Sequence, residues 1–455
     1  MIRSISVAET WAKSLDLHLD LSGTRVRSSL ESALLVAIRD GRLHPGTRLP
    51  SSRALAADLG VARNTVAEVY SQLVAAGWLT AQTGSGTSVA ARAAAAGATG
   101  PASSEAARQP RYDLRPGEPD VSSFPRREWL AAARKALAVA PDHVLGYGDR
   151  RGLPELRAAL AEYLSRARGV VTDPARILIC SGYAAGLAAV SRALREAGAR
   201  TVAVEEYGHQ LHRDIVTAQG LDLRLLSIDG RGAVPADADA VVLTPAHQFP
   251  LGMTLDPRRR RAFIERVPLV IEDDYDGEFR YDRQPVGAMQ ALAPDRVLYA
   301  GTASKSLAPG VRLAWLVVPP RLADPVTAAL AGGPSAIDQL TLAEFLTCGA
   351  YDRHIRRARL AYRRRRDRLV TALDGLGLEL TGISAGQHAV ITDIRTTRVS
   401  RVLSSAREHG LALAGLDTYA ARADPDRAGL AIGYGRPPEH AYTAALARLS
   451  AVLAT

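Results

Sequence analysis

Residues 297–312 of this 455-residue chain read VLYAGTASKSLAPGVR. A short apolar strand, 297–299, runs into small and hydroxyl residues that surround Lys305, and Arg312 closes the stretch. Only three of the 57 basic residues in the chain are lysines. A lysine amine, unlike an arginine, can lose its proton in a shielded site and form a Schiff base. A surface lysine retained by chance is the plain alternative, but the small neighbours favour covalent chemistry at Lys305, with Thr302 and Arg312 holding a phosphate.

Four further apolar strands precede this one, at residues 177–179, 201–204, 240–243 and 269–271. Helical patterns separate them, which predicts an α/β domain with a mainly parallel sheet. Ligands of such domains bind at the carboxyl ends of the strands.

The run EDDYDGE (272–278) follows one of these strands. Alternation along an extended chain puts Asp273 and Tyr275 on the same side. A carboxylate beside a phenol can hold the two polar edges of an aromatic cofactor. A magnesium site is disfavoured because the run holds no other type of ligand.

Another strand, 177–179, runs into Cys180-Ser181-Gly182, and a helix opens at Tyr183. Such a turn presents free backbone N–H groups and the positive end of the helix dipole to an anion. A phosphate cradle, an acid beside a phenol, and a lysine therefore follow three strands of one sheet. Together they indicate pyridoxal 5′-phosphate, which carries one phosphate, one aldehyde and one pyridine nitrogen. A dinucleotide site is disfavoured because Gly146-Tyr147-Gly148 lacks a third glycine and follows no strand.

The 90 residues before position 91 carry helical patterns over 24–40, 53–58 and 63–76, and two short strands around a glycine-rich tip follow them. Two short helices joined by a tight turn can place the second helix in the major groove of DNA. Its leading residues, Arg63, Asn64 and Thr65, would then meet base edges. From the pattern alone, a small helical interaction domain is the alternative.

Residues 91–110 are rich in alanine, glycine, serine and proline and hold no large apolar side chain, which is typical of a flexible linker. The predicted organisation is therefore a DNA-binding domain at 1–90, a linker at 91–112 and a cofactor-binding domain at 113–455.

Composition sets further bounds. Hydrophobic residues make up 47% of the chain and charged residues 23%, which is ordinary for a folded protein. The two cysteines, Cys180 and Cys348, exclude a disulfide framework and a cysteine-rich zinc site, and we expect no bound metal. No run approaches the ~20 apolar residues of a membrane span, and the N-terminus lacks the apolar region of a secretory signal, so we expect a cytoplasmic protein. The net charge of +10 permits nucleic-acid binding without demonstrating it.

Motifs in both parts of the chain resemble known families. Three motifs resemble the GntR-type winged helix-turn-helix: PGTRLPSSR (45–53), VARNTV (61–66) and GSGT (84–87). Four motifs resemble a fold-type I, class I aminotransferase: TPAHQFPLG (244–252), EDDYD (272–276), GTASK (301–305) and HIRR (354–357). The whole chain is similar to the MocR family of transcriptional regulators, which joins these two parts.

The resemblance implies a role for each matching residue. Lys305 would form the internal aldimine with pyridoxal phosphate, Asp273 would pair with the pyridine nitrogen, and Tyr275 would pair with the ring hydroxyl. The residues implied to hold the phosphate are Tyr183 and Ala184 through their amides, Thr302 and Arg312. In the homodimer that this fold implies, Tyr147 would reach the site of the other subunit. Double-stranded operator DNA would be contacted by Arg48, Arg53, Arg63, Asn64, Thr65 and Gly86.

Three positions depart from the family pattern. Residues 205–209 read EEYGH, so an alignment without a gap gives His209 the place of the ring-stacking tyrosine, whereas a gap restores Tyr207. Phe249 replaces the asparagine that holds the ring hydroxyl in aminotransferases. Ala431 takes the place of the arginine that clamps the carboxylate of an amino acid, although Arg427 or Arg436 could reach in from the flanking loops.

These patterns favour a transcriptional regulator that senses pyridoxal phosphate itself, or an amine or amino acid effector as an aldimine. The alternative is an active aminotransferase with an accessory DNA-binding domain. The winged helix and Ala431 favour the regulator, and we expect weak or no transaminase turnover. A regulator without cofactor is disfavoured because nothing else requires the residues gathered around Lys305.

Overall fold

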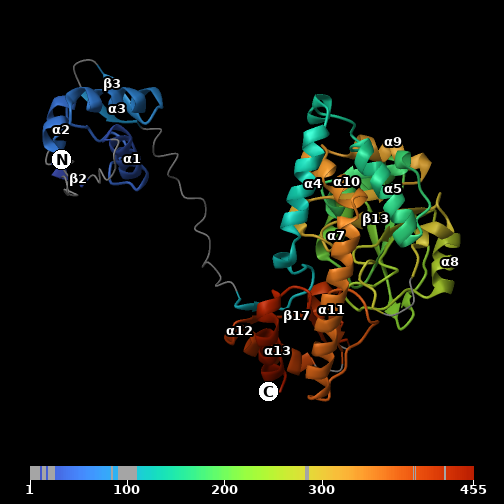
Figure 1. Cartoon of the computed structure of the whole chain (residues 1–455). Coiled ribbons are helices and arrows are strands. Elements are labelled where there is room, and N and C mark those ends of the chain that lie inside the picture. Colours follow the sequence, from blue (N-terminus) through green and yellow to red (C-terminus); the bar gives the residue numbers. More distant parts are fainter. Residues whose placement is uncertain are drawn as a thin grey trace. The chain divides into compact units, whose positions relative to one another are not determined.

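The computed structural model describes residues 11–12, 17–18, 26–82, 86–90, 110–281, 286–392, 394, 396–424 and 427–454. Contacts divide the chain into two compact units, Met1–Gln109 and Pro110–Thr455 (Figure 1). Most of the predicted linker, and residues 84 and 85 of the predicted glycine-rich tip, lie outside the described residues. Among the described helices, none combines the length and apolar character that crossing a membrane requires.

The first unit combines helices with short antiparallel strand pairs. Its elements are β1 (Trp11–Ala12), β2 (Leu17–His18), α1 (Val26–Arg39), α2 (Ser52–Leu59), α3 (Arg63–Ala75), β3 (Leu79–Gln82) and β4 (Gly86–Val89). The three predicted helices and the two predicted strands are confirmed. Leu30 and Leu34 of α1 and Val66 and Leu73 of α3 are almost fully buried in one core, as the helical spacing of apolar residues requires.

The second unit is built on a large sheet. Its strands are β6 (Ile177–Cys180), β7 (Thr201–Glu205), β8 (Asp222–Leu226), β11 (Ala240–Leu243), β12 (Leu269–Asp273), β13 (Val297–Thr302) and β14 (Ala314–Val317). They form a seven-stranded sheet in the order β6-β14-β13-β12-β11-β7-β8. Strand β14 runs antiparallel to both neighbours, and the other pairings are parallel. The prediction of a mainly parallel sheet is therefore confirmed.

Helices pack on both faces of this sheet. They are α4 (Arg126–Val139), α5 (Pro154–Arg168), α6 (Tyr183–Glu196), α7 (Gln210–Ala218), α8 (Pro257–Arg266), α9 (Pro320–Ala329) and α10 (Ala336–Thr347). Helices α6, α7 and α9 share a core with Leu178 and Leu316 on one face, whereas α5 and α10 share a core with Ile179 and Trp315 on the other. Neighbouring strand residues thus serve opposite cores because their side chains alternate.

A smaller sheet follows, with its own helices. Its strands β15 (Ala389–Ile391), β17 (Ala414–Gly415) and β18 (Leu430–Ile432) have the order β15-β18-β17. The helices are α11 (Ala350–Asp374), α12 (Thr396–Glu408) and α13 (Glu439–Leu453). The remaining strands are β5 (Tyr112–Asp113) with β16 (Leu411–Ala412), and β9 (Ile228–Asp229) with β10 (Gly232–Ala233). Single 3₁₀ turns are η2 (Val121–Ser123), η3 (Asp142–Leu145), η4 (Pro174–Arg176), η5 (Met289–Leu292), η6 (Pro309–Val311) and η7 (Leu416–Tyr419).

Candidate functional site

A cavity of about 220 Å³ opens at the carboxyl ends of the parallel strands. Strand β12 ends at Asp273 and β13 ends at Thr302, so both residues reach the same edge of the sheet. Tyr147 does not line the cavity; it is fully exposed just after η3, and its role in another subunit stays a prediction. The other side chains predicted to bind the cofactor do line it: Tyr183, Ala184, His209, Asp273, Tyr275, Thr302, Lys305 and Arg312.

One part of the cavity is suited to a phosphate. Helix α6 begins at Tyr183, directly after Gly182, whose φ of 109° favours glycine. A Cβ at Gly182 would lie 3.2 Å from the guanidinium of Arg312, so the glycine lets this arginine approach the start of the helix. Arg312 itself has a positive φ of 54°. The first N–H groups of α6, the Thr302 hydroxyl and Arg312 therefore line one cavity as a cradle for an anion.

Asp273 and the hydroxyl of Tyr183 are buried polar groups next to each other in the cavity. Burial raises the pKa of Asp273 to about 8; the Lys305 amine lowers it and neighbouring carboxylates raise it. The hydroxyl of Tyr183 is buried without a hydrogen-bond partner among the described residues. A protonated pyridine nitrogen would stabilise the Asp273 carboxylate in this environment. These residues therefore fit pyridoxal phosphate.

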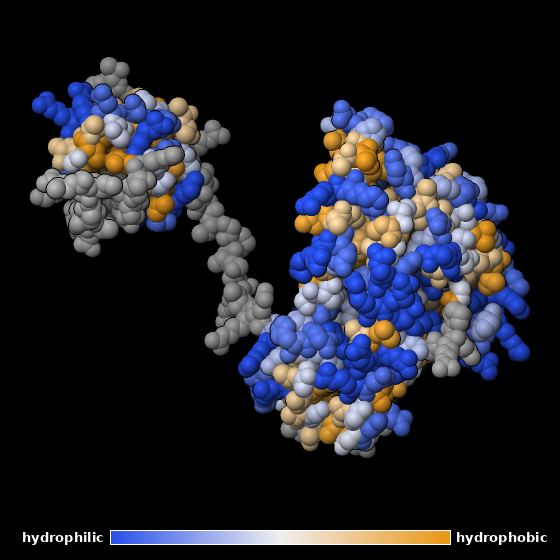
Figure 2. All heavy atoms as spheres, in the orientation of Figure 1, coloured by the Kyte–Doolittle hydropathy of each residue, from blue (hydrophilic) through white to orange (hydrophobic). Residues whose placement is uncertain are grey.

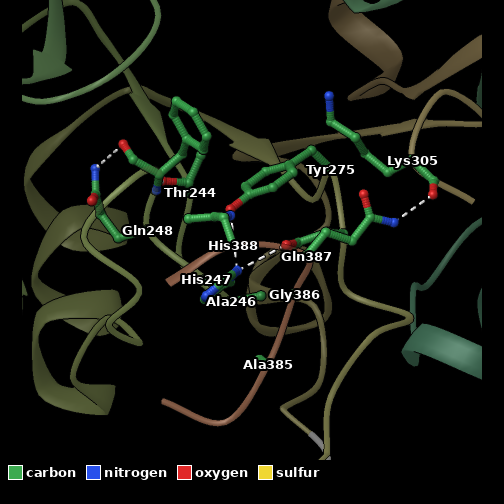
Figure 3. Close-up of polar contacts among 12 residues, drawn as sticks. Thr244, Ala246, His247, Gln248, Tyr275, Lys305, Ala385, Gly386, Gln387 and His388 are labelled. Atoms are coloured by element: carbon green, nitrogen blue, oxygen red, sulfur yellow. Dashed lines mark hydrogen bonds and ion pairs between the residues drawn. The ribbon is translucent and has the colours of Figure 1, made fainter. Parts of the chain in front are cut away.

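Lys305 lines the cavity with an amine of lowered pKa. Burial lowers the pKa of Lys305 below its ordinary value, against the attraction of Asp273 and other carboxylates. Its Nζ donates to the carbonyl of Gly117. The side-chain amide of Gln387 donates to the backbone carbonyl of Lys305 at 2.7 Å (Figure 3). A lower pKa leaves more of the amine in its nucleophilic, unprotonated form, and bound pyridoxal phosphate supplies the aldehyde with which such an amine reacts.

His209 and Tyr207, the two candidates for the stacking ring, have different surroundings. The His209 ring stacks on Phe249 with 4.2 Å between centroids and 15° between planes. Burial lowers the pKa of His209 to about 4, so the ring is neutral at pH 7. The Tyr207 hydroxyl instead bonds Asp424 at 3.3 Å, and the guanidinium of Arg427 lies over its ring. These contacts favour His209, although its stacking on a cofactor stays a prediction.

Glu272 and Asp274 of the acidic run stabilise the fold. The Glu272 carboxylate accepts the backbone N–H groups of Met289 and Gln290 at 2.7 and 2.8 Å. Asp274 forms a buried ion pair with Arg168 at 2.7 Å. Neither carboxylate lines the cavity. Of the run, Asp273 and Tyr275 are the residues that face it.

Sequence reasoning missed a buried cluster next to Tyr275. His247 Nδ1 lies 2.8 Å from Oδ2 of Asp276, and the Tyr275 hydroxyl lies 3.2 Å from the same nitrogen (Figure 3). His388 lies beside them, with 4.9 Å between its ring centroid and that of His247. These residues are far apart in the chain. The TPAHQFPLG motif and the acidic run each contain one member, but no spacing links the two motifs to His388.

Ala431 stands where aminotransferases have the arginine that binds the substrate carboxylate, and no nearby arginine in the described part of the chain takes over that role. Ala431 is fully buried in the middle of β18. Arg427 and Arg436 are each engaged in ion pairs, and neither lines the cavity. Arg213 lines it, but its guanidinium bonds the carbonyl of Tyr419 at 3.3 Å. The flanking arginines therefore do not replace the missing clamp in this structure.

The first unit presents the residues predicted to contact DNA. Arg48, Arg53, Arg63 and Asn64 are exposed, and Thr65 is half-buried. Helix α2 is ended by Gly60 with a φ of 66°, and α3 begins at Arg63 without a side-chain cap. Free N–H groups at this helix start can bind phosphate.

Arg48 also lies next to Gly86, the predicted DNA contact at the start of β4. A Cβ at Gly86 would lie 3.3 Å from Nε of Arg48. Residues Arg48 and Ser88 form an isolated antiparallel bridge. The structure thus brings Arg48 and the start of β4 together, although they are far apart in the sequence.

Two families match separate parts of the chain. Residues 27–89 match "Bacterial regulatory proteins, gntR family". Residues 113–412 match "Aminotransferase class I and II". The first match lies in the first unit and the second match in the second unit.

Curated relatives match most of the chain. The HTH-type pyridoxine biosynthesis transcriptional regulator PdxR of Corynebacterium glutamicum is 32% identical over 442 residues, which cover 94% of this chain and 96% of that protein. The probable rhizopine catabolism regulatory protein MocR of Rhizobium meliloti is 35% identical over 74% of each chain. The HTH-type transcriptional regulator TauR of Rhodobacter capsulatus is 34% identical over 78% of this chain and 80% of its own.

Solved structures agree on the fold of the second unit. An archaeal alanine:glyoxylate aminotransferase matches with a TM-score of 0.68 and 22% identity, over 75% of this chain and 90% of that one. The aminotransferase fold thus comes with a cavity whose residues fit the cofactor of that class. The chain therefore belongs to the MocR-type, pyridoxal phosphate-dependent transcriptional regulators, in which a GntR-family DNA-binding region precedes an aminotransferase class I and II region.

Proposed function

We propose that this regulator reports the occupancy of the Lys305 cavity to its DNA-binding unit. The occupant is pyridoxal phosphate itself, or an amine or amino acid that reacts with the cofactor held there. One observation carries the proposal: Lys305, whose pKa is lowered, lines the same cavity as the start of helix α6 and Arg312. The lysine captures the aldehyde covalently, and the helix start holds the phosphate.

Each lining residue has a proposed role that follows from its place in the cavity. Lys305 forms the Schiff base, Asp273 pairs with the ring nitrogen, and Tyr275 bonds the ring oxygen. His209 stacks on the ring as a neutral imidazole, since burial lowers its pKa to about 4. The phosphate is bound by Tyr183 and Ala184 through their amides, Thr302 and Arg312.

The DNA-binding domain is proposed to span residues 1–90, followed by a linker at 91–112 and the cofactor domain at 113–455. The exposed cations and the uncapped start of α3 support an operator interface. Because the operator is chromosomal DNA, we place the protein in the cytoplasm. The proposed contacts to double-stranded DNA are Arg48, Arg53, Arg63, Asn64, Thr65 and Gly86.

We also propose a homodimer. Leu130, Leu137 and Val139 of α4 are 61%, 41% and 79% exposed, and Leu145 of η3 is 59% exposed. Figure 2 shows hydrophobic surface over α4. Leu130 and Leu137 are seven residues apart and therefore share one side of α4. Exposed apolar patches on protein surfaces mark interaction sites. Tyr147 follows directly and would extend toward the other subunit's cavity, and two DNA-binding units would read two half-sites, repeated or inverted.

The test of the cofactor site is covalent trapping. Protein mixed with pyridoxal phosphate should absorb visible light as a Schiff base, and borohydride reduction followed by peptide mapping should place the cofactor on Lys305. Lys305→Ala should abolish the absorption, whereas Lys135→Ala, which alters an exposed lysine paired with Glu344, should not. A wild-type protein that stays colourless in excess cofactor would refute the proposed site.

A working aminotransferase is the second candidate, since Lys305, Asp273 and Tyr275 are intact. Ala431 weighs against it. Transamination needs the Cα–H bond of the substrate held perpendicular to the ring, and misplacement by ~1 Å can cost about 100-fold in rate. We expect added amines to change the absorption spectrum while amino acid and keto acid pairs turn over slowly. Turnover of about 1–10³ per second would establish the enzyme instead.

A further inference from the structure

A buried polar cluster lies behind the hydroxyl of Tyr275. Figure 3 shows that hydroxyl pointing at His247, which follows β11. Asp276 lies in the turn after β12, and His388 directly precedes β15. His247, Asp276 and His388 are 3%, 3% and 4% exposed. None of the three lines the cavity, so none has a role in the cofactor contacts proposed above.

The hydrogen-bond partners of His247 assign its ring proton to Nδ1. Nδ1 lies 2.8 Å from Oδ2 of Asp276 and 3.2 Å from the Tyr275 hydroxyl. A carboxylate can only accept, so the shorter contact requires a proton on Nδ1. That proton is then shared with the oxygen of Tyr275, which also accepts. The pair is closely packed, because a Cβ at Gly386 would lie 2.6 Å from both Nδ1 of His247 and Oδ2 of Asp276.

Tyr275 retains its own proton. Burial raises the pKa of the Tyr275 phenol well above its ordinary value, and the carboxylates of Asp276, Asp273 and Glu205 raise it further. Because Nδ1 of His247 is a donor, it cannot accept the phenol proton. The Asp276 carboxylate is a second acceptor within reach of the phenol. A ligand in the cavity, which Tyr275 lines, therefore competes with Asp276 for the O–H of Tyr275.

The cluster does not need a metal ion to explain it. The candidate ligand atoms of His247, Asp276 and His388 lie within 4.8 Å of one another. However, each imidazole already bonds an acceptor: His247 bonds Asp276, and Nε2 of His388 lies 3.1 Å from the carbonyl of Pro250. Burial also lowers the pKa of His388 well below its ordinary value, which leaves that ring neutral. Hydrogen bonding therefore accounts for the three side chains.

We propose that Asp276 and His247 form a positioning pair that fixes Tyr275 as a hydrogen-bond donor, so that the cavity selects a ring whose oxygen is ionised. The inference rests on the proposed placement of the cofactor's ring oxygen at Tyr275. A hydrogen bond to an ionised oxygen is roughly twice as strong as a neutral one. Reversing the donor at Tyr275 therefore weakens binding of the ionised ring and leaves binding of an uncharged analogue nearly unchanged.

Asp276→Asn tests the proposal because an amide can donate where the carboxylate accepts. With an amide N–H facing Nδ1, that nitrogen becomes an acceptor, and the phenol O–H donates to it instead of to the ligand. We expect the affinity for pyridoxal phosphate to fall by about tenfold or more. We also expect visible absorption of the bound cofactor to weaken relative to its near-ultraviolet absorption. Wild-type protein should prefer pyridoxal phosphate over its 3-O-methyl derivative, and the variant should lose this preference.

A double-mutant cycle separates positioning from a general structural role. If the pair acts through the phenol, Asp276→Asn changes neither affinity nor spectrum further in a Tyr275→Phe background. His247→Asn, which keeps an N–H donor near the position of Nδ1, should retain the wild-type spectrum, whereas His247→Leu should lose it.

Three results would overturn the proposal: equal effects of Asp276→Asn in both backgrounds, an unchanged spectrum in that single variant, or a wild-type spectrum in His247→Leu. Wild-type protein that binds no pyridoxal phosphate would instead refute the proposed function. The two failures are therefore distinguishable.

Discussion

Burial decides what the ionisable side chains of the cavity can do. Asp273 and Lys305 have pKa values shifted in opposite directions, and in both cases burial disfavours the charged form. The ring of His209 is neutral for the same reason. A ligand with a cationic ring would stabilise the Asp273 carboxylate, and a ligand that reacts with the Lys305 amine would remove its buried charge. One ligand therefore lowers the free-energy cost of burying both groups.

Asp273→Asn should change the pH dependence of stability in cofactor-free protein. Burial raises the pKa of Asp273 from 3.8 to about 8. Between these values the unfolded chain loses the proton and the folded chain retains it, so wild-type stability falls as pH rises. Asparagine has no proton to lose. From pH 5 to pH 8, the free energy of unfolding of wild type should therefore fall relative to the variant by at least about 1 kcal/mol.

Urea denaturation at the two pH values measures this difference. Asp142→Asn, at an exposed position, should track wild type at both values. A constant difference between wild type and Asp273→Asn across this range would show that Asp273 is ionised in the folded protein at pH 5. In pyridoxal phosphate titrations the same variant should bind more weakly, because the ring nitrogen loses its charged partner.

At the residue scale, the sequence predicts the groups that follow strands. Lys305, Asp273 and Tyr275 could be placed together because strand ends of a parallel sheet meet at one edge. The pairing of His247 with Asp276 could not, because the loop after β11 and the turn after β12 meet only through the folded geometry. The choice between His209 and Tyr207 likewise depends on contacts that a single sequence does not contain, and it stays a prediction.

At the scale of elements, short connections determine how the sites are presented. The turn between α2 and α3 leaves the start of α3 uncapped, and the bridge between Arg48 and Ser88 holds the Arg48 loop against β4. Strand β14 was hard to predict because its four apolar residues, AWLV, fit a strand or a buried helix equally well. Its antiparallel direction follows from a short return after β13, which parallel pairing does not allow.

Arg48→Ala, Arg53→Ala and Arg63→Ala should each weaken binding to duplex DNA that the wild type selects from a random library. Each loss of a phosphate contact should also reduce the slope of log affinity against log salt by about one. Fluorescence anisotropy at several salt concentrations measures both quantities. Arg27→Ala serves as the control, because this exposed arginine of α1 pairs with Glu68 and is not a predicted contact. Three variants with wild-type affinity and slope would refute the proposed interface.

At the scale of the whole molecule, the unit that binds DNA and the unit that binds the cofactor are packed separately. The second unit buries its cofactor cavity but exposes apolar side chains along α4 and η3. A dimer that covers this face would join two DNA-binding units. Joined half-sites bind with higher apparent affinity because the second contact becomes intramolecular.

Leu130→Glu combined with Leu137→Glu should therefore produce monomers. Both side chains are exposed in the single chain, so the fold itself should lose little stability. Sedimentation velocity should show half the mass of wild type, and affinity for the selected duplex should fall with it. Leu292→Glu, at an exposed apolar residue of η5, should remain a dimer. A double variant that sediments as wild type would rule out this face as the interface.

The most direct test asks whether DNA binding depends on the chemistry at Lys305. The measurement is the affinity of full-length protein for the selected duplex at fixed salt, with and without pyridoxal phosphate. For wild type and for Lys135→Ala, the affinity should change by about fivefold or more when the cofactor is added, the lower range of typical coupling between sites. Lys305→Ala should retain the cofactor-free affinity and show no change. An identical response in Lys305→Ala, or no response in wild-type protein that demonstrably carries the cofactor, would contradict the account.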